Sequence, residues 1–196
     1  MTSPIYSQPP NLYVFLAAVA VWVVSDLSIG FRYGNQSGSK QDRGSKHAIG
    51  AAVCGGVLSA ALLPVWVPAA EMPYPAAAFW LGIGLLLLGV SVRQYAVRTL
   101  EDDFSLEVSV DETDTVVTSG PYQWVRHPSY TGGLVTLVGI GVAVGHWLSF
   151  GATVVAGVLG YRYRICVEER ALRATLGDSY EEYASRTPYR LLPFVW

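Results

Sequence analysis

Residues 76–92 read AAAFWLGIGLLLLGVSV and contain no charged side chain. A helix needs about 20 mainly apolar residues to cross a hydrocarbon core of roughly 30 Å. This stretch, with its unbroken run Leu85–Leu88, therefore predicts a membrane helix. The whole chain of 196 residues agrees, because 52% of it is hydrophobic and only 14% is charged, whereas soluble domains average about 25% charged residues. We expect a membrane protein rather than a water-soluble globule.

Four more apolar stretches predict further spans, and together with residues 76–92 they make five: Leu12–Ile29, Ala48–Ala70, Tyr130–Gly145 and Phe150–Val167. The last two are separated only by residues 146–149, a spacing that is typical of a helical hairpin. The sequence thus predicts an all-α polytopic membrane bundle of five transmembrane helices that ends in a C-terminal hairpin. We divide it into residues 1–92, with three helices, and residues 93–196, with helices four and five and a C-terminal segment.

Charge placement predicts the orientation of this bundle. With the N-terminus outside, all 13 Lys and Arg residues fall on the cytoplasmic side, in residues 30–47, 93–126 and 162–190. The outer side keeps only Glu71 and His146. Cytoplasmic loops carry the excess of Lys and Arg in membrane proteins, so we expect the C-terminus in the cytoplasm. The formal net charge of −2 argues against a nucleic-acid partner, since no basic field exists to attract phosphates.

One segment before the fourth span concentrates polar and aromatic residues: residues 120–130 read GPYQWVRHPSY. A residue that precedes proline is biased away from the helix, so we expect His127 in extended or turn geometry with its ring free. Pro128 suits the first turn of the span, and the exposed N–H groups of that turn could receive an anion. The alternative is an interfacial anchor of belt aromatics and a topogenic charge, made by Tyr122, Trp124, Tyr130 and Arg126.

A second cluster crosses the cytoplasmic end of the fifth span, where Arg164 and Glu168 are four residues apart on one helix face. A surface pair of this kind adds only about 0.2–0.5 kcal/mol, and Arg placed before Glu is the poorer orientation. A guanidinium can instead bind a carboxylate through two parallel bonds, while a glutamate can take an ammonium. Polar residues at membrane depth are functional candidates; Asp26 is another, near the cytoplasmic end of the first span. No Cys/His cluster has metal-ligand spacing, so we expect no metal.

The motifs of the second half resemble the isoprenylcysteine carboxyl methyltransferase family over about Thr99 to Phe194. The resemblance covers half the chain and keeps the order of the family's elements. It differs from the family pattern at Asp114 and near Glu107 and Val108. The motifs are Val117-Thr118-Ser119-Gly120-Pro121-Tyr122, Arg126-His127-Pro128-Ser129-Tyr130, Arg164-x-x-x-Glu168-Glu169, Gly177-Asp178-x-Tyr180-x-x-Tyr183 and Leu192-Pro193-Phe194.

This resemblance implies a membrane-embedded methyltransferase that uses S-adenosylmethionine, releases S-adenosylhomocysteine and holds the cofactor in a cytoplasmic pocket. Residues 93–196 would be the catalytic region, and the acceptor would be the carboxylate of an isoprenylated cysteine or a similar lipophilic molecule. It implies catalytic roles for Arg164 and Glu168, with Arg164 orienting the substrate carboxylate. It implies cofactor contacts at Asp114, Thr115, Val116, Val117, Tyr122, His127, Pro128, Ser129, Tyr130 and Glu168. Such a protein would lie in the endoplasmic reticulum of a eukaryote or in the inner or cell membrane of a prokaryote.

Other functions fit parts of the same pattern. NADPH-dependent membrane sterol and steroid reductases carry a similar Arg-His-Pro-x-Tyr element, but they usually show an acidic residue after the following glycine, where this chain has Gly133 after Gly132. Phospholipid methyltransferases and small-thiol methyltransferases share the broader pattern and differ mainly in the acceptor. A membrane scaffold without enzymatic activity would leave the Arg164–Glu168 arrangement unexplained.

Overall fold

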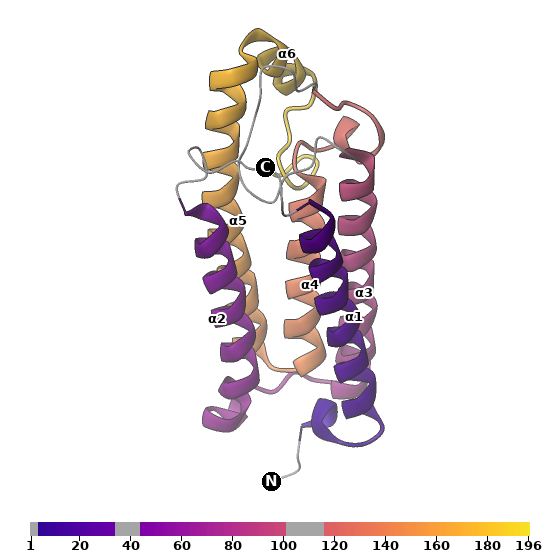
Figure 1. Ribbon diagram of the computed structural model, residues 1–196. Helices are drawn as coiled ribbons and strands as arrows, with labels where there is room; N and C mark the ends of the chain where they lie inside the picture. Colours follow the sequence, from indigo (N-terminus) through magenta and orange to yellow (C-terminus); the bar gives the residue numbers. More distant parts are fainter. Residues whose placement is uncertain (1–3, 34–43, 101–115) are drawn as a thin grey trace.

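Five long helices lie side by side in the computed structural model, which describes residues 4–33, 44–100 and 116–196 (Figure 1). The chain reverses direction from each of these helices to the next, and a short sixth helix lies at the end where α5 finishes. In the described part of the chain the regular elements are all helical, as predicted. They are α1 (Asn11–Tyr33), α2 (Ser45–Trp66), α3 (Pro75–Leu100), α4 (Pro128–Val144), α5 (Trp147–Leu176) and α6 (Asp178–Arg186), with short 3-10 helices η1 (Ile5–Ser7), η2 (Pro68–Ala70) and η4 (Gly120–Gln123).

Three of the described helices, α1, α2 and α3, are long and apolar enough to cross a membrane, with mean hydropathies of 2.1, 2.0 and 2.0. We therefore treat the protein as an integral membrane protein. Helix α4 is apolar too but has only 17 residues. Helix α5 continues past the predicted end of its span at Val167 and carries a charged stretch as far as Leu176. Five crossings therefore stay a prediction.

The second span ends earlier than predicted. The prediction ran to Ala70, but α2 ends at Trp66 and the next residue, Val67, leaves the helical conformation at φ −132° and ψ 65°. The cause is Pro68, because a residue that precedes proline is disfavoured in the α region. Pro64, by contrast, is accommodated inside α2. The chain after Trp66 turns through η2 instead of extending the helix.

Packing places α4 at the centre of the bundle. It lies against both α3 and α5, while α1 covers α3 and α2 covers α5. Helices α3 and α4 approach so closely that a Cβ on Gly82 would clash with the backbone of Ala143, and one on Gly132 would clash with the backbone of Arg93. Small residues permit such approach in membrane bundles, where van der Waals packing replaces the hydrophobic effect. The helical hairpin predicted for the last two spans is confirmed, since only two residues separate α4 from α5.

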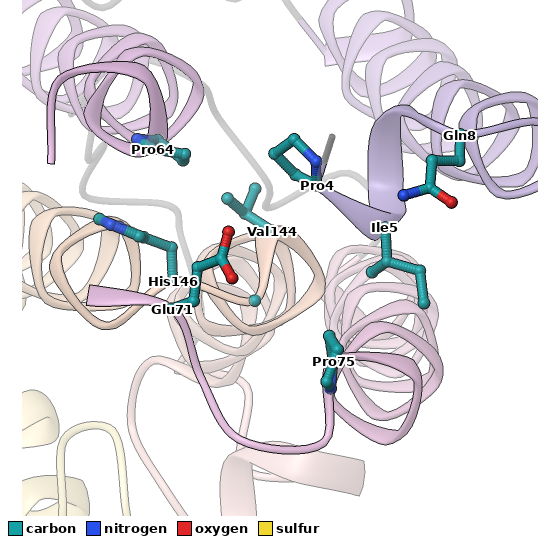
Figure 2. A pocket seen from close by; sticks show the side chains of 9 residues that line it. Pro4, Ile5, Gln8, Pro64, Glu71, Pro75, Val144 and His146 are labelled. Carbon is teal, nitrogen blue, oxygen red and sulfur yellow. The ribbon is translucent and has the colours of Figure 1, made fainter. Parts of the chain in front are cut away.

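The end of the bundle that holds the N-terminal residues carries a pocket of about 170 Å³, drawn in Figure 2. Glu71 and His146, the two residues predicted for the outer side, both line it and form a backbone bridge. The His146 ring is buried: Nδ1 accepts a hydrogen bond from the backbone nitrogen of Ser149 at 3.3 Å, and Nε2 lies 2.9 Å from the carbonyl oxygen of Val67. His146 thus ties the α4–α5 turn to the end of α2.

Candidate functional site

The two sequence motifs meet at the opposite end of the bundle, where α4 begins and α5 approaches its end. The hydroxyl of Tyr130 donates a 2.6 Å hydrogen bond to Oε2 of Glu168 and accepts one of 3.2 Å from Nε of Arg164. Nδ1 of His127 lies 3.9 Å from the same Glu168 oxygen. The structure therefore brings together His127, Tyr130, Arg164 and Glu168, all of which the sequence singled out.

The backbone around Pro128 follows the prediction, but the His127 ring does not. Helix α4 begins at Pro128, and His127 precedes it outside the helical region, at φ −126° and ψ 59°. The ring was expected to be free, and this was wrong: the residue is only 5% exposed, stacks on Tyr130 at 5.6 Å and lies 3.4 Å from Oε1 of Glu169. The reason is tertiary, because the backbone N–H of His127 donates to the carbonyl oxygen of Arg190 and brings that segment over the turn.

Arg164 and Glu168 occupy different environments although they are one helical turn apart. Arg164 is 4% exposed and donates from Nη1 to the hydroxyl of Ser45 at 2.7 Å, at the first residue of α2. The Glu168 side chain keeps 29% of its surface exposed. The site thus has a buried cationic end and an acidic end that reaches water.

Two further residues of the implied cofactor set are engaged with other helices. The Ser129 hydroxyl accepts a 3.1 Å hydrogen bond from Nη1 of Arg93 on α3. Tyr122 is buried; its hydroxyl donates to the carbonyl oxygen of Ala96 at 3.3 Å, and its own carbonyl oxygen accepts from the hydroxyl of Tyr183 at 2.8 Å. Burial raises the pKa of the Tyr122 phenol, and the nearby Glu168 carboxylate raises it further, so the phenol remains a donor.

The remaining residues of that set lie at the start of the segment before η4. Val116 is half-buried and packs against the cluster that Tyr180 and Tyr183 form on α6, and Val117 is half-buried as well. Asp114 and Thr115 lie outside the described residues, as do Glu107 and Val108, where the sequence departs from the family pattern.

Glu169 belongs to the Arg164-x-x-x-Glu168-Glu169 motif, but the sequence predicted no role for it. Its carboxylate accepts two 3.0 Å hydrogen bonds from Arg190 and one of 3.3 Å from Arg173, and Nε of Arg126 lies 3.3 Å away. Burial raises the pKa of this carboxyl, but hydrogen bonds from His127 and Arg190 and the charge of Arg126 outweigh it and lower the pKa to about 2. The sequence did carry one sign of a separate role for this residue, the pair of adjacent acids Glu168 and Glu169. Neighbouring side chains on a helix point about 100° apart, so the two carboxylates cannot have the same surroundings.

Residues 187–196, which we call the C-terminal strap, hold the turn before α4 in place. Backbone N–H groups of Arg126 and His127 donate to the carbonyl oxygens of Tyr189 and Arg190, each at 2.9 Å. The hydroxyl of Thr131 donates to the carbonyl oxygen of Leu191 at 2.7 Å. Two of these bonds satisfy the N–H groups of the residues before α4, which have no acceptor inside the helix, and the third attaches the first turn of α4 to the strap.

Comparison with known proteins gives the same family as the motifs. The model of the isoprenylcysteine carboxyl methyltransferase (ICMT) family matches residues 81–174, which include most of α3, all of α4 and nearly all of α5. The resemblance to this family is confirmed. The chain is 35% identical over 116 residues to protein-S-isoprenylcysteine O-methyltransferase B of Arabidopsis thaliana, which covers 58% of each protein. It is 34% identical over 121 residues to the Homo sapiens protein-S-isoprenylcysteine O-methyltransferase, covering 59% of this chain and 42% of that one.

A solved ICMT structure shares the fold. The eukaryotic intramembrane Ras methyltransferase ICMT superposes with a TM-score of 0.65 over 96% of this chain and 69% of that chain, at 23% sequence identity. The alignments with the curated ICMT relatives from Arabidopsis thaliana and Homo sapiens span only about half of those proteins. The family model matches the part of the chain in which α4 and α5 carry the candidate site.

Proposed function

We propose that this protein is an S-adenosylmethionine-dependent methyltransferase that methylates the carboxylate of an isoprenylated cysteine or a similar amphiphilic acceptor. One observation carries the proposal: Arg164 and Glu168, of opposite charge, are joined through the Tyr130 hydroxyl at the polar end of an apolar bundle. The names of the curated relatives support the same reaction.

The residues of the site suit both molecules that such a reaction needs. A cationic methyl donor with an amino-acid group suits a carboxylate among aromatic rings, and Glu168 lies beside the rings of His127 and Tyr130, which stack on each other. An acceptor carboxylate requires a planar donor fork, which a guanidinium such as that of Arg164 provides. We therefore assign cofactor binding to the Glu168 side of the site, including Ser129 and Tyr122, and acceptor binding to Arg164.

The reaction requires the protein mainly to position the methyl donor and the acceptor. S-adenosylmethionine, when bound, supplies an electrophilic methyl group on a positively charged sulfur. An α-carboxyl group has a pKa of about 3.5, so the acceptor is already ionised at neutral pH and no general base is needed. Arg164 would hold the acceptor oxygen on the line of attack, since alignment at about 3–3.5 Å accounts for much of such a rate enhancement. Its burial would keep water from competing for the guanidinium.

The membrane arrangement belongs to the same proposal. We infer five crossings, with the N-terminus outside and the site at the cytoplasmic ends of α4 and α5. The acceptor's lipid tail would then stay within the bilayer, while the polar cofactor would come from the cytosol. The membrane would be the endoplasmic reticulum in a eukaryote and the inner or cell membrane in a prokaryote.

Calorimetry of the purified protein in detergent tests the cofactor. We expect S-adenosylhomocysteine to bind and NADPH not to bind. Binding of NADPH without binding of S-adenosylhomocysteine would replace this proposal with a reductase. Transfer to a phospholipid or a small thiol, but not to a farnesylcysteine analogue, would keep the cofactor and change the acceptor.

Substitution of Arg164 tests the assignment within the site. Arg164→Ala should abolish methyl transfer to a farnesylcysteine analogue and leave the affinity for S-adenosylhomocysteine within about tenfold. Arg162→Ala is the matched control, because Arg162 lies two residues away on α5 and is exposed. Turnover that survives in Arg164→Ala would show that this guanidinium does not hold the acceptor.

A further inference from the structure

A polar cluster links α1, α3 and α4 next to the candidate site. Nε of Arg93 donates a 2.8 Å hydrogen bond to Oδ1 of Asp26 on α1. Nη1 of the same guanidinium donates to the Ser129 hydroxyl at 3.1 Å and approaches the Ser129 carbonyl oxygen at 3.4 Å. Arg93 therefore joins a carboxylate in one apolar helix to the first turn of another. Asp26 lies outside the 81–174 region that matches the family.

Fastening α1 to α3 does not by itself account for this cluster. The amide of Gln94 already donates to the Ser25 hydroxyl at 2.6 Å and to the Ser25 carbonyl oxygen at 3.1 Å, one residue away on each helix. The Arg93 side chain is only 14% exposed, although that of Asp26 keeps 38% of its surface exposed. Desolvating a guanidinium is costly, and one carboxylate partner offsets that cost only when further hydrogen bonds are made. The further hydrogen bond of Arg93 goes to Ser129. Arg93 therefore acts on the start of α4 as well as on α1.

The first turn of α4 is held from two sides. On one side, α3 approaches the α4 backbone so closely that Gly132 has no room for a Cβ beside Arg93. On the other side, Tyr161 of α5 occupies the space above Gly133, and the Tyr130 hydroxyl binds Glu168. Arg93 fixes Ser129 between these contacts, directly before Tyr130.

We propose that Arg93 is a positioning residue for the methyl-donor site, and that Asp26 is the counter-ion that aims its guanidinium at Ser129. This inference rests on the proposed function, because Ser129, Tyr130 and Glu168 belong to the assigned cofactor site. Asp26 orients Nε, which turns Nη1 toward the start of α4. The orientation of that turn then determines whether the Tyr130 hydroxyl points toward Glu168 and Arg164.

A charge swap distinguishes an Arg93 that orients the start of α4 from an Arg93 that only links α1 to α3. The double variant Asp26→Arg with Arg93→Glu restores an α1–α3 ion pair but removes the donor to Ser129. We expect it to unfold at the wild-type temperature in detergent and to bind S-adenosylhomocysteine about tenfold more weakly by calorimetry, as the loss of one charged hydrogen bond implies. Arg93→Lys is the second variant, because an ammonium retains the charge but cannot serve Asp26 and Ser129 through two fixed nitrogens; we expect the same weakening.

Gln94→Ala provides the matched control, since it removes the neighbouring link to α1 and leaves Arg93 in place. It should lower the unfolding temperature and leave the affinity for S-adenosylhomocysteine unchanged. Wild-type affinity in either Arg93 variant would overturn the inference, and if the swap does not fold, Arg93→Lys decides alone. Failure of the wild-type protein to bind S-adenosylhomocysteine would refute the proposed function instead.

Discussion

Replacing Glu169 by Gln should destabilise the protein more than any other single charge change near the site. The carboxylate is 3% exposed and accepts hydrogen bonds from Arg190 and Arg173 within 3.3 Å, with Nε of Arg126 at 3.3 Å and Nε2 of His127 at 3.4 Å. An amide would keep the shape but leave these donors without their counter-charge. Removing one partner of a buried ion pair costs about 3–5 kcal/mol, a large share of a typical stability of about 5–15 kcal/mol.

Equilibrium unfolding in mixed detergent micelles, followed by tryptophan fluorescence, measures this loss. Glu182→Gln is the matched control, because Glu182 pairs with Arg186 on α6 while both side chains stay more than half exposed. An exposed pair is worth about 0–1 kcal/mol, so the control should unfold almost as the wild type does. If Glu169→Gln were no less stable than Glu182→Gln, the contacts of Glu169 with Arg190 and Arg126 would not stabilise the fold.

Three further outcomes follow from the same contacts. Because the folded pKa of Glu169 is about 2 and its ordinary value is 4.5, its contribution should be complete above pH 4.5 and decline as the pH falls toward 2; acid unfolding of wild type and Glu169→Gln should therefore converge in that range. Tyr130→Phe removes the hydroxyl that joins Arg164 to Glu168 and should lower methyl transfer at least about tenfold in a radiolabel assay. Gly82→Ala should lower the unfolding temperature because its Cβ would clash with the α4 backbone, whereas Gly84→Ala, with open space around it, should not.

Local patterns in the sequence predicted the elements that local forces decide. Hydropathy located the five long helices, and the proline rule placed the start of α4 at Pro128. The same rule explains why α2 ends before its predicted end, since Pro68 acts on Val67 as Pro128 acts on His127. Hydropathy missed the C-terminal ends of α1, α3 and α5, because these helices continue into polar residues beyond their apolar stretches. The meeting of the two motifs also followed, because a short hairpin makes α4 and α5 antiparallel neighbours.

Long-range contacts decided what the sequence did not reveal. The His127 ring is covered because a segment more than 60 residues later accepts hydrogen bonds, through its carbonyl oxygens, from the turn that contains it. Arg126 is a topogenic charge in the sequence prediction, and the fold adds what the sequence did not reveal, that it lies buried beside Glu169. A positive charge at a membrane boundary has the same sequence signature whether it faces lipid headgroups or a buried carboxylate, so only the fold distinguishes these cases.

The start of α4 explains why elements far apart in the chain converge on the site. The helix begins at Pro128, so the N–H groups of the two residues before it have no acceptor inside the helix, and the C-terminal strap supplies acceptors for both. In the same turn, the Ser129 hydroxyl accepts a hydrogen bond from Arg93 of α3, and the Tyr130 hydroxyl donates one to Glu168 of α5. The turn is thus held by contacts from three directions, the strap, α3 and α5. A site that aligns two bound molecules without acid or base chemistry depends on position alone, so rigidity at this turn is the property on which the proposed reaction relies.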